Sequence, residues 1–328
     1  MNLFRFARAG TAGAAIATVE GDPRASYIAG GTNIVDLMKD DAVMPSLLVD
    51  ITMLPFAHID ADDSTVRIGA LSRMSDVADA KAVVHGLPAV SQALLESASP
   101  QLRNMATIGG NIMQRTRCAY FRDVATACNK RSDGTGCSAL GGVNRMHAIM
   151  GGSDRCICVH ASDLAVALVA FDAMLHLRGS AGERTMPLSD FYLLPGSTPA
   201  RETALAHGEL IAAVEVPLAA YTRNSTYLKA RDRSQYEFAL VSVAAGLDIS
   251  GGQIRAARIA LGGVAPVPWR AREAERALQG QTPSRAVFTA AAQSALRGAR
   301  GYGQNDYKIP LAQRAIVRAL QTVSGSAA

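Results

Sequence analysis

The stretch Ala29-Gly30-Gly31-Thr32-Asn33 decides the fold, because it places two glycines between a predicted strand at 27–29 and a predicted helix that begins at Ile34. Glycines let backbone N–H groups approach an anion closely, and the first turn of a helix leaves such groups without partners. Thr32 and Asn33 add side chains that can bind phosphate oxygens or cap the helix. The stretch is a candidate phosphate cradle, and a tight turn is the alternative.

A second stretch of the same kind, Thr107-Ile108-Gly109-Gly110-Asn111, follows later in the chain. Two glycine turns of similar chemistry in one predicted domain favour a shared ligand. The patterns G-x-G-x-x-G and G-x-x-x-x-G-K-[ST] are absent, which argues against a Rossmann NAD site and against a P-loop.

Around these turns, predicted strands and helices alternate, which indicates an α/β architecture for the first half. From about 113 to 158 the periodicity is lost, and so long an irregular stretch in a compact domain predicts a functional loop. After residue 185, a run of strands precedes a run of helices, which predicts a separate α+β domain. We therefore predict two domains, 1–182 and 186–324, with the loop inside the first.

Composition narrows the class of protein. The 328 residues are 49% hydrophobic and 19% charged, with a net charge of +5. No basic run is interleaved with aromatic residues, so nucleic-acid binding is not expected, and an acidic partner subunit or an anionic cofactor explains the charge equally well. No apolar run is long enough for a membrane span. The weakly apolar N-terminus, soon followed by Glu20 and Asp22, does not predict a signal peptide of its own.

All five cysteines are confined to one part of the chain, which indicates one local metal or redox site. They are Cys118, Cys128, Cys137, Cys156 and Cys158. The paired C-x₂₋₄-C spacing of structural zinc is missing, whereas four spread thiolates can hold an iron–sulfur cube. Many Arg and Lys residues in the segment favour thiolates. Iron–sulfur, zinc and free buried thiols remain open. One intervening residue makes it difficult for Cys156 and Cys158 to bind the same metal.

Two further positions carry alternatives. Asp163 can accept a hydrogen bond from a ribityl or ribose hydroxyl, but either Ser162 or Asp163 can also cap the helix that follows. Lys229 can neutralise negative charge on a reduced ring, but such a lysine is more often a solvated strand end.

Taken together, these motifs resemble the flavin-binding subunit of xanthine-oxidase-type molybdenum hydroxylases, the family of the carbon monoxide dehydrogenase medium subunit. The stretches that carry the resemblance are 29–33, Gln101–Asn104, 107–111 and Ser162-Asp163, with Leu261–Ala265 and Pro268 resembling the C-terminal domain of the family. The resemblance covers nearly the whole chain. It implies a two-part FAD-binding domain of vanillyl-alcohol-oxidase type plus a C-terminal α+β domain. The FAD contacts that it implies are Ile28, Ala29, Gly30, Gly31, Thr32, Asn33, Ile34, Gln101, Thr107, Gly109, Gly110, Asn111, Ser162, Asp163 and Lys229.

Part of the cysteine segment resembles an insertion found in one subgroup, the FAD subunits of bacterial periplasmic aldehyde oxidoreductases. The matching stretches are Arg115–Cys118, Cys128–Arg131 and Gly136-Cys137. The resemblance implies a [4Fe–4S] cluster bound by Cys118, Cys128, Cys137 and Cys156, and it gives Cys158 no role.

The resemblance also implies a function. Electrons would pass from a molybdenum-cofactor subunit through a [2Fe–2S] subunit to the FAD of this chain, in a heterotrimer, and then to an external acceptor. No catalytic residue is expected here, because the substrate is oxidised on a partner. Co-export to the periplasm with a partner is expected, with the cytoplasm as the alternative location. Two rival interpretations are a stand-alone flavin oxidase and a zinc-stapled scaffold without redox activity.

Overall fold

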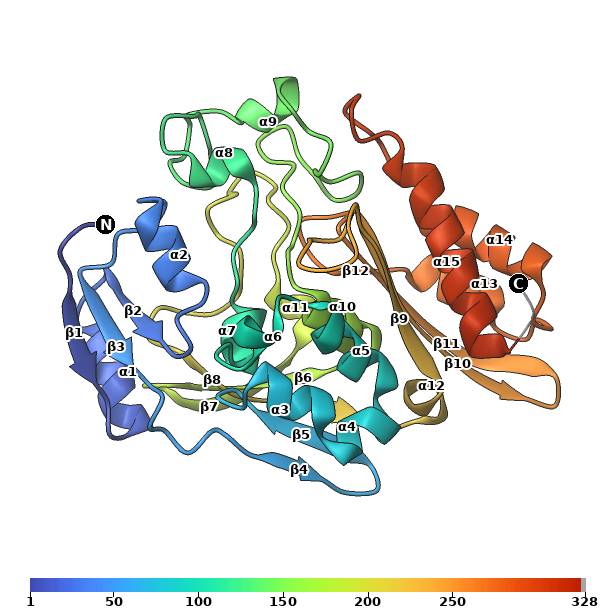
Figure 1. Cartoon of the computed structure of the whole chain (residues 1–328), viewed down its shortest axis with the longest axis horizontal. Coiled ribbons are helices and arrows are strands. Elements are labelled where there is room, and N and C mark those ends of the chain that lie inside the picture. Colours follow the sequence, from blue (N-terminus) through green and yellow to red (C-terminus); the bar gives the residue numbers. More distant parts are fainter. Residues whose placement is uncertain (326–328) are drawn as a thin grey trace.

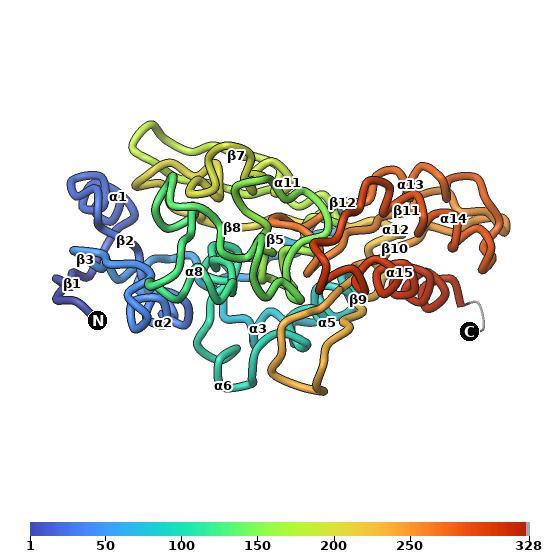
Figure 2. The backbone as a smooth tube through the Cα atoms, turned by 90° about the horizontal axis from the view of Figure 1, so that it is seen from above, coloured from blue at the N-terminus to red at the C-terminus, as the bar shows by residue number. Residues whose placement is uncertain are grey.

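The computed structural model describes residues 1–325, which form three β-sheets with helices packed on them (Figure 1). The N-terminal sheet lies at one end of the elongated molecule, and the C-terminal sheet with its helices lies at the other (Figure 2). This mixed architecture confirms the predicted fold class. Within the described part, no helix is long and apolar enough to cross a bilayer.

The first sheet is parallel and carries the first glycine loop. Its strands are, in spatial order, β1 (Arg5–Arg8), β3 (Leu47–Asp50) and β2 (Ala25–Ile28). Parallel neighbours need crossover connections, which contain α1 (Ala12–Glu20) and α2 (Ile34–Lys39). The loop between β2 and α2 therefore lies at the carboxyl end of a parallel strand, where α/β sheets bind ligands.

The second sheet is antiparallel and lies at the centre of the molecule. Its strands, in spatial order, are β4 (Ile59–Ala61), β5 (Thr65–Gly69), β8 (Leu210–Pro217), β6 (Met174–Gly179) and β7 (Gly182–Pro187). The helices of this part are α3 (Met74–Asp79), α4 (Lys81–Gly86), α5 (Pro88–Glu96), α6 (Pro100–Arg103), α7 (Ile108–Ile112), α10 (Asp163–Ala170) and α11 (Leu188–Phe191). The second glycine loop spans the start of α7, so the two glycine loops belong to different sheets.

The third sheet is also antiparallel, in the order β12 (Trp269–Arg270), β11 (Gln253–Gly262), β10 (Val241–Ser250) and β9 (Ser225–Ala230). Its helices are α12 (Ala220–Arg223), α13 (Arg272–Leu278), α14 (Arg285–Ala295) and α15 (Lys308–Ser324). The apolar faces of α13, α14 and α15 join β10 and β11 in one core cluster. This part is the predicted α+β domain.

The domain boundary predicted between 182 and 186 falls inside the second sheet and is corrected here. Strand β8 lies between β5 and β6, although it follows them by a long connection. The order of predicted strands along the chain does not reveal that β8 pairs with the earlier strands β5 and β6. The sheets divide between Pro217 and Ser225 instead.

Helix α10 joins the central part to the third sheet. All of its residues are buried, as expected for a helix that is apolar on every side after Asp163. It packs on α5 and on β10 and β11. The Ala165 N–H donates to Ser162 Oγ at 2.9 Å, which confirms a side-chain cap and assigns it to Ser162.

Residues 113–158 form the irregular segment that the sequence predicts, here called the cysteine segment. Only two short helices interrupt it, α8 (Ala119–Arg122) and α9 (Ser138–Gly141). In Figure 1 the segment rises above the middle of the molecule, between α2 and the start of α15. It is therefore placed to contact both ends of the chain.

Candidate functional site

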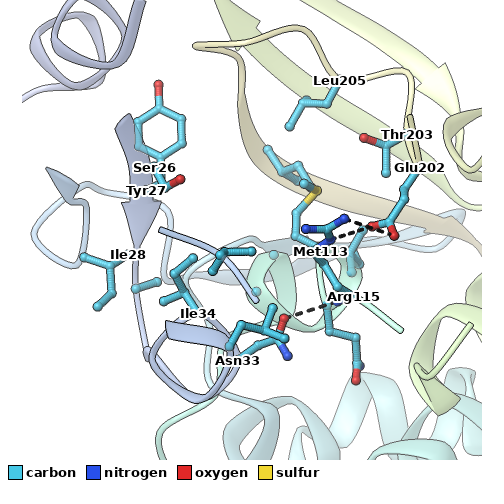
Figure 3. Close-up of a pocket in the computed structure, with 18 of the residues that line it drawn as sticks. Ser26, Tyr27, Ile28, Asn33, Ile34, Met113, Arg115, Glu202, Thr203 and Leu205 are labelled. Atoms are coloured by element: carbon cyan, nitrogen blue, oxygen red, sulfur yellow. Dashed lines mark hydrogen bonds and ion pairs between the residues drawn. The ribbon is translucent and has the colours of Figure 1, made fainter. Parts of the chain in front are cut away.

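A cavity of about 960 Å³ opens between the first glycine loop and the connection that leads into β8 (Figure 3). Volumes of this size accommodate cofactors. Its lining includes ten of the predicted FAD contacts, which are Ile28, Ala29, Gly30, Gly31, Thr32, Asn33, Ile34, Thr107, Gly109 and Gly110. Figure 3 shows Ile28, Asn33 and Ile34 on one side, with Glu202, Thr203 and Leu205 on the other.

The first glycine loop presents unused donors to this cavity. The backbone N–H groups of Gly31, Thr32 and Asn33 have no acceptor within residues 1–325. Gly31 has φ +71°, a conformation that favours glycine. Asn33 is at the N-cap position of α2 but does not cap it. Its Oδ1 accepts from the Arg115 N–H at 3.2 Å, and its buried Nδ2 has no partner among the described residues.

The second glycine loop uses its donors inside the protein. Ile108 N–H bonds to Ser72 O at 3.0 Å, and Gly109 N–H bonds to Ala70 O at 2.7 Å. The next two N–H groups, at Gly110 and Asn111, bond to Thr107. A Cβ on Gly109 would lie 3.0 Å from Ala70 Cβ. This loop lines the cavity, but its backbone donors are bonded within the protein, unlike those of the first loop.

A polar wall faces the first loop across the cavity. Arg115 Nε lies 2.9 Å from a Glu202 carboxylate oxygen, and Lys130 Nζ lies 2.8 Å from the other (Figure 3 shows the Arg115 pair). Burial alone would raise the pKa of Glu202, but Arg115 and Lys130 outweigh it and hold that pKa below its usual value. Two residues of the cysteine segment therefore hold Glu202, and one of them, Arg115, also contacts Asn33 of the first loop.

His160 and Tyr192 continue this wall. Their rings meet edge to face, with centroids 4.4 Å apart. Burial lowers the pKa of His160 to about 4, and Lys130 acts in the same direction. The Nε2 atom of His160 is buried and finds no partner in the part of the chain that the structure describes. A neutral imidazole edge is therefore available to a ligand.

The other five predicted FAD contacts do not line the cavity. Gln101 is exposed on α6. Asn111 Oδ1 accepts from Ser162 Oγ at 2.5 Å. Asp163 accepts from Lys229 Nζ at 2.8 Å and from Tyr227 Oη at 2.6 Å.

Lys229 is therefore not the solvated strand end that the general preference of lysine suggests. Its side chain is 1% exposed, and its ammonium also donates to Glu96 O. A buried pair of this kind becomes costly when one partner is removed. The pair holds β9 against the start of α10. No local sequence pattern predicts it, because its two partners are distant in the chain.

Helix α2 is tied to the cysteine segment by its acidic residues. Asp36 lies 2.7 Å from Arg117 and 2.9 Å from Arg122, and Asp40 also pairs with Arg122. These arginines precede and follow Cys118. The helix that begins at the first glycine loop therefore contacts the part of the segment that carries Cys118.

The basic residues of the segment are largely paired, which revises the expectation of a free electropositive setting. Arg145 pairs with Asp232, and Arg155 pairs with Asp133. Arg131 donates to four backbone carbonyls of 120–126. Most of this positive charge fastens the segment, and Lys130 is the ammonium that also acts on the thiols of Cys156 and Cys158.

The five cysteines are all free, and the Cys118 thiol lies near enough to the thiols of Cys128 and Cys158 to interact with both. Cys128 and Cys137 face each other across an antiparallel bridge. Burial raises the pKa of the Cys118 thiol to about 12, and the thiols of Cys158 and Cys128 add to this. The Cys156 and Cys158 thiols interact with each other, and this interaction lowers the pKa of Cys158 and raises that of Cys156.

The positions of the cysteine side chains do not form a site for a single metal ion. Within residues 1–325, no three Cys, His, Asp or Glu side chains converge on a point that could hold one metal ion. This geometry gives the zinc-stapled interpretation no support. A four-iron cluster makes a different demand, because its thiolates bind separate iron atoms around a larger core. Five free thiols in one place supply the donor chemistry for it.

Sequence reasoning missed several residues of the site. Glu202 and Tyr192 lie outside every glycine or cysteine motif, and Lys130 was counted only as one of the basic residues. The charge of Glu202 gives no signal, because its partners are distant in sequence.

The fold is of mixed α/β type, and the cavity is lined by a glycine loop whose backbone donors are unused among the described residues. The family model of the FAD binding domain in molybdopterin dehydrogenase matches residues 2–219, and that of the CO dehydrogenase flavoprotein C-terminal domain matches residues 225–323. The chain belongs to the family of FAD-binding subunits of the molybdenum hydroxylases, which are oxidoreductases.

Individual relatives agree with this placement. The chain is 43% identical over 323 residues to the aldehyde oxidoreductase FAD-binding subunit PaoB of Escherichia coli, with 98% of each chain covered. It is 27% identical to the glyceraldehyde dehydrogenase medium chain of Sulfolobus acidocaldarius, over 85% of this chain and 82% of the relative. A chain of the carbon monoxide dehydrogenase of Hydrogenophaga pseudoflava superposes with a TM-score of 0.77 at 27% identity, covering 100% of this chain and 99% of the other.

Proposed function

We propose that this chain is the FAD and [4Fe–4S] electron-transfer subunit of a molybdenum-dependent aldehyde oxidoreductase. It receives electrons from the [2Fe–2S] clusters of one partner and delivers them to an external acceptor, while the aldehyde is oxidised on a molybdenum-cofactor partner. The heterotrimer and the substrate class follow the similarity to PaoB, a relative named as an aldehyde oxidoreductase subunit. FAD, when bound, supplies a group that can store two electrons.

The observation that carries the FAD assignment is the set of unused donors at the first glycine loop. Gly31, Thr32 and Asn33 offer backbone N–H groups at the start of α2, and Asn33 adds its unpartnered Nδ2. Such groups bind the oxygens of a diphosphate. The buried Nε2 of His160 on the opposite wall is a further group that a ligand would satisfy.

The remaining five proposed FAD contacts do not line the cavity. Asn111, Ser162, Asp163 and Lys229 form a buried network, and Gln101 lies on α6. Contact of Asp163 or Lys229 with FAD requires their mutual ion pair to rearrange. Substitution of these five residues is therefore the most direct test of the proposed set of FAD contacts.

The visible spectrum of the purified native complex, followed by separation of this chain, tests the proposal. Flavin bands with a broad iron–sulfur shoulder on this chain are expected. Flavin without iron on this chain would support a stand-alone flavin oxidase or an FAD-only subunit. A colourless chain that contains zinc would support the scaffold interpretation and overturn the proposed electron transfer.

The proposed cluster ligands are Cys118, Cys128, Cys137 and Cys156, with Cys158 as the spare thiol. Cys158→Ser is expected to keep its iron, and Cys156→Ser is expected to lose it, because a complete cluster needs four thiolates. The measurement is iron per chain in each variant. Iron lost in Cys158→Ser but retained in Cys156→Ser would reverse the choice between these two.

The proposed location is the periplasm, reached by co-export with a partner that carries the export signal. The support is the likeness to the aldehyde oxidoreductase subunit named above. Cell fractionation with the assembled complex in the periplasmic fraction is expected. Recovery with the cytoplasm would contradict the location and leave the flavin assignment untouched.

A further inference from the structure

His147 approaches a proposed cluster ligand directly. Its Nε2 atom lies 3.2 Å from Cys118 Sγ, within hydrogen-bond distance. A thiolate accepts hydrogen bonds and has none to donate, so a ligating Cys118 requires the proton of this bond on His147 Nε2. The other ring nitrogen, Nδ1, is buried and has no partner among residues 1–325. The imidazole therefore has one polar contact, and that contact is the sulfur of Cys118.

The backbone of His147 is held by two side chains from the C-terminal part. Its carbonyl accepts from Lys308 Nζ at 3.0 Å and from Asn305 Nδ2 at 3.2 Å. Asn305 also donates to Ala148 O at 3.0 Å, and Lys308 donates to Met146 O at 3.1 Å. Three consecutive carbonyls, 146–148, are thus fixed by two fully buried residues.

Lys308 is unusual because it lies at the start of α15 with its side chain completely buried, and the acceptors of its ammonium among the described residues are all backbone carbonyls. Its third acceptor is Gly263 O at 2.5 Å, at the end of β11. An ammonium has three N–H donors, and three carbonyls accept them. Three hydrogen bonds of the Lys308 side chain therefore join the backbone of residues 146 and 147 to the end of the third sheet.

Neighbouring contacts strengthen the same attachment. Asn144 Nδ2 donates to Tyr302 O at 2.9 Å, and its Oδ1 accepts from the Gln304 N–H at 3.2 Å. In Figure 1 the red connection that leads into α15 lies near the green cysteine segment at the top of the molecule. The end of the cysteine segment is therefore positioned by the C-terminal part of the chain.

From this geometry we propose that His147 is a positioning residue of the cluster: its Nε2–H donates to the sulfur of Cys118, and Lys308 and Asn305 hold it there. The inference rests on the proposed function, because it assumes that Cys118 binds iron. A hydrogen bond to a ligating sulfur stabilises the form of the cluster that carries more negative charge. The reduced cluster carries one more electron, so this bond raises the reduction potential.

The test is a reductive titration of the native complex, with the cluster signal of this chain followed by electron paramagnetic resonance. His147→Phe keeps a ring of similar shape and removes the donor, and His147→Gln keeps an N–H donor. We expect His147→Phe to retain iron and to lower the ratio of reduced to oxidised cluster about tenfold at fixed poise, or 59 mV for one electron. His147→Gln should fall between this variant and the natural chain. Lys308→Met should shift the ratio in the same direction, because it frees the carbonyl of His147.

The control is His85→Phe, which replaces an exposed histidine of α4 and should leave the potential unchanged. An unchanged potential in His147→Phe with iron retained would overturn the inference alone. Loss of iron from both His147→Phe and His147→Gln would also overturn it, because a donor would then not suffice. A natural chain without iron would overturn the proposed cluster and this inference together.

Discussion

The two glycine loops share a Gly-Gly pair next to Thr and Asn, yet the structure gives them different surroundings. At the first loop, three backbone N–H groups and Asn33 Nδ2 have no acceptor within residues 1–325. At the second, every N–H from Ile108 to Asn111 is bonded inside the protein. The same motif therefore keeps its donors free in one place and uses them within the fold in the other, which is why we propose a ligand role for the first loop.

The loops also depend on each other. A Cβ added to Gly30 would lie 2.0 Å from the carbonyl oxygen of Met105, just before the second loop. The second loop packs in turn on Ala70, at the end of the central sheet. The central sheet thus supports the second loop, and the second loop supports the first. Substitutions in the second loop should act through stability, and substitutions in the first should act on ligand binding.

Gly31→Val should have the largest effect, on flavin. A β-branched residue is strained at φ +71°, and its methyl groups would move the N–H donors at the start of α2. We expect flavin affinity to fall by at least on the order of 100-fold, which corresponds to about 2.7 kcal/mol. The measurement is flavin per chain after dialysis. The matched control is Gly298→Val, with φ +83° and open space around it, which should keep its flavin. Full flavin occupancy in Gly31→Val would remove the first loop from the site.

Gly109→Ala should reduce stability before it affects flavin. The new methyl group would meet Ala70 Cβ at 3.0 Å and Ala70 O at 3.1 Å, and neither can move independently of the sheet. Overpacking of this kind costs about 1–3 kcal/mol of unfolding free energy. Denaturant unfolding of the flavin-free protein measures it, with Gly141→Ala, where nothing lies within 4 Å, as the control. Lost flavin at unchanged stability would break the contrast between the loops.

A fall in pH should destabilise the folded chain through His160, which lies in the cavity wall opposite the first loop. The pKa of His160 is about 4 in the folded chain because of burial, below its ordinary value of 6.5. The unfolded chain therefore takes up a proton between pH 6.5 and pH 4, and stability falls as the pH falls through this window. The contribution of His160 is at most about 1.4 kcal/mol per pH unit. Unfolding of the flavin-free protein at several pH values should show a smaller slope in His160→Phe than in the natural chain. An equal slope in both would place the titrating group elsewhere, and His85→Phe on exposed α4 should leave the slope in place.

Asp36→Asn should have the smallest effect. It removes the carboxylate that holds Arg117 and Arg122, but this side chain is 41% exposed, so each pair contributes no more than about 0.5–1 kcal/mol. We expect faster proteolysis of the cysteine segment and a change in flavin affinity below about threefold. Asp79→Asn on α3 is the control. A large loss of flavin would mean that the cysteine segment controls the first loop more strongly than these contacts suggest.

Local patterns in the sequence determined a substantial part of this molecule. The two glycine stretches contained eight residues that line the cavity, which are Ala29, Gly30, Gly31, Thr32, Asn33, Thr107, Gly109 and Gly110. The confinement of five cysteines located the irregular segment, and the continuous apolar run after Asp163 produced the buried α10. Ser162 could be predicted as a cap because capping is decided within one helical turn. In each case the physical cause acts over a few neighbouring residues.

The tertiary structure decided the features that depend on distant partners. Strand β8 pairs with β5 on one side and with β6 on the other, both of which precede it in the chain. The residue pattern of 209–216 predicts a strand but not these partners. Lys229 is buried because Asp163 meets it, and Lys308 is buried because three carbonyls from two distant segments surround its ammonium. The donors of the second glycine loop are used because Ala70 and Ser72 lie beside it. Hydrogen bonding and burial depend on what the folded chain brings near a group, so identical short motifs acquire different roles.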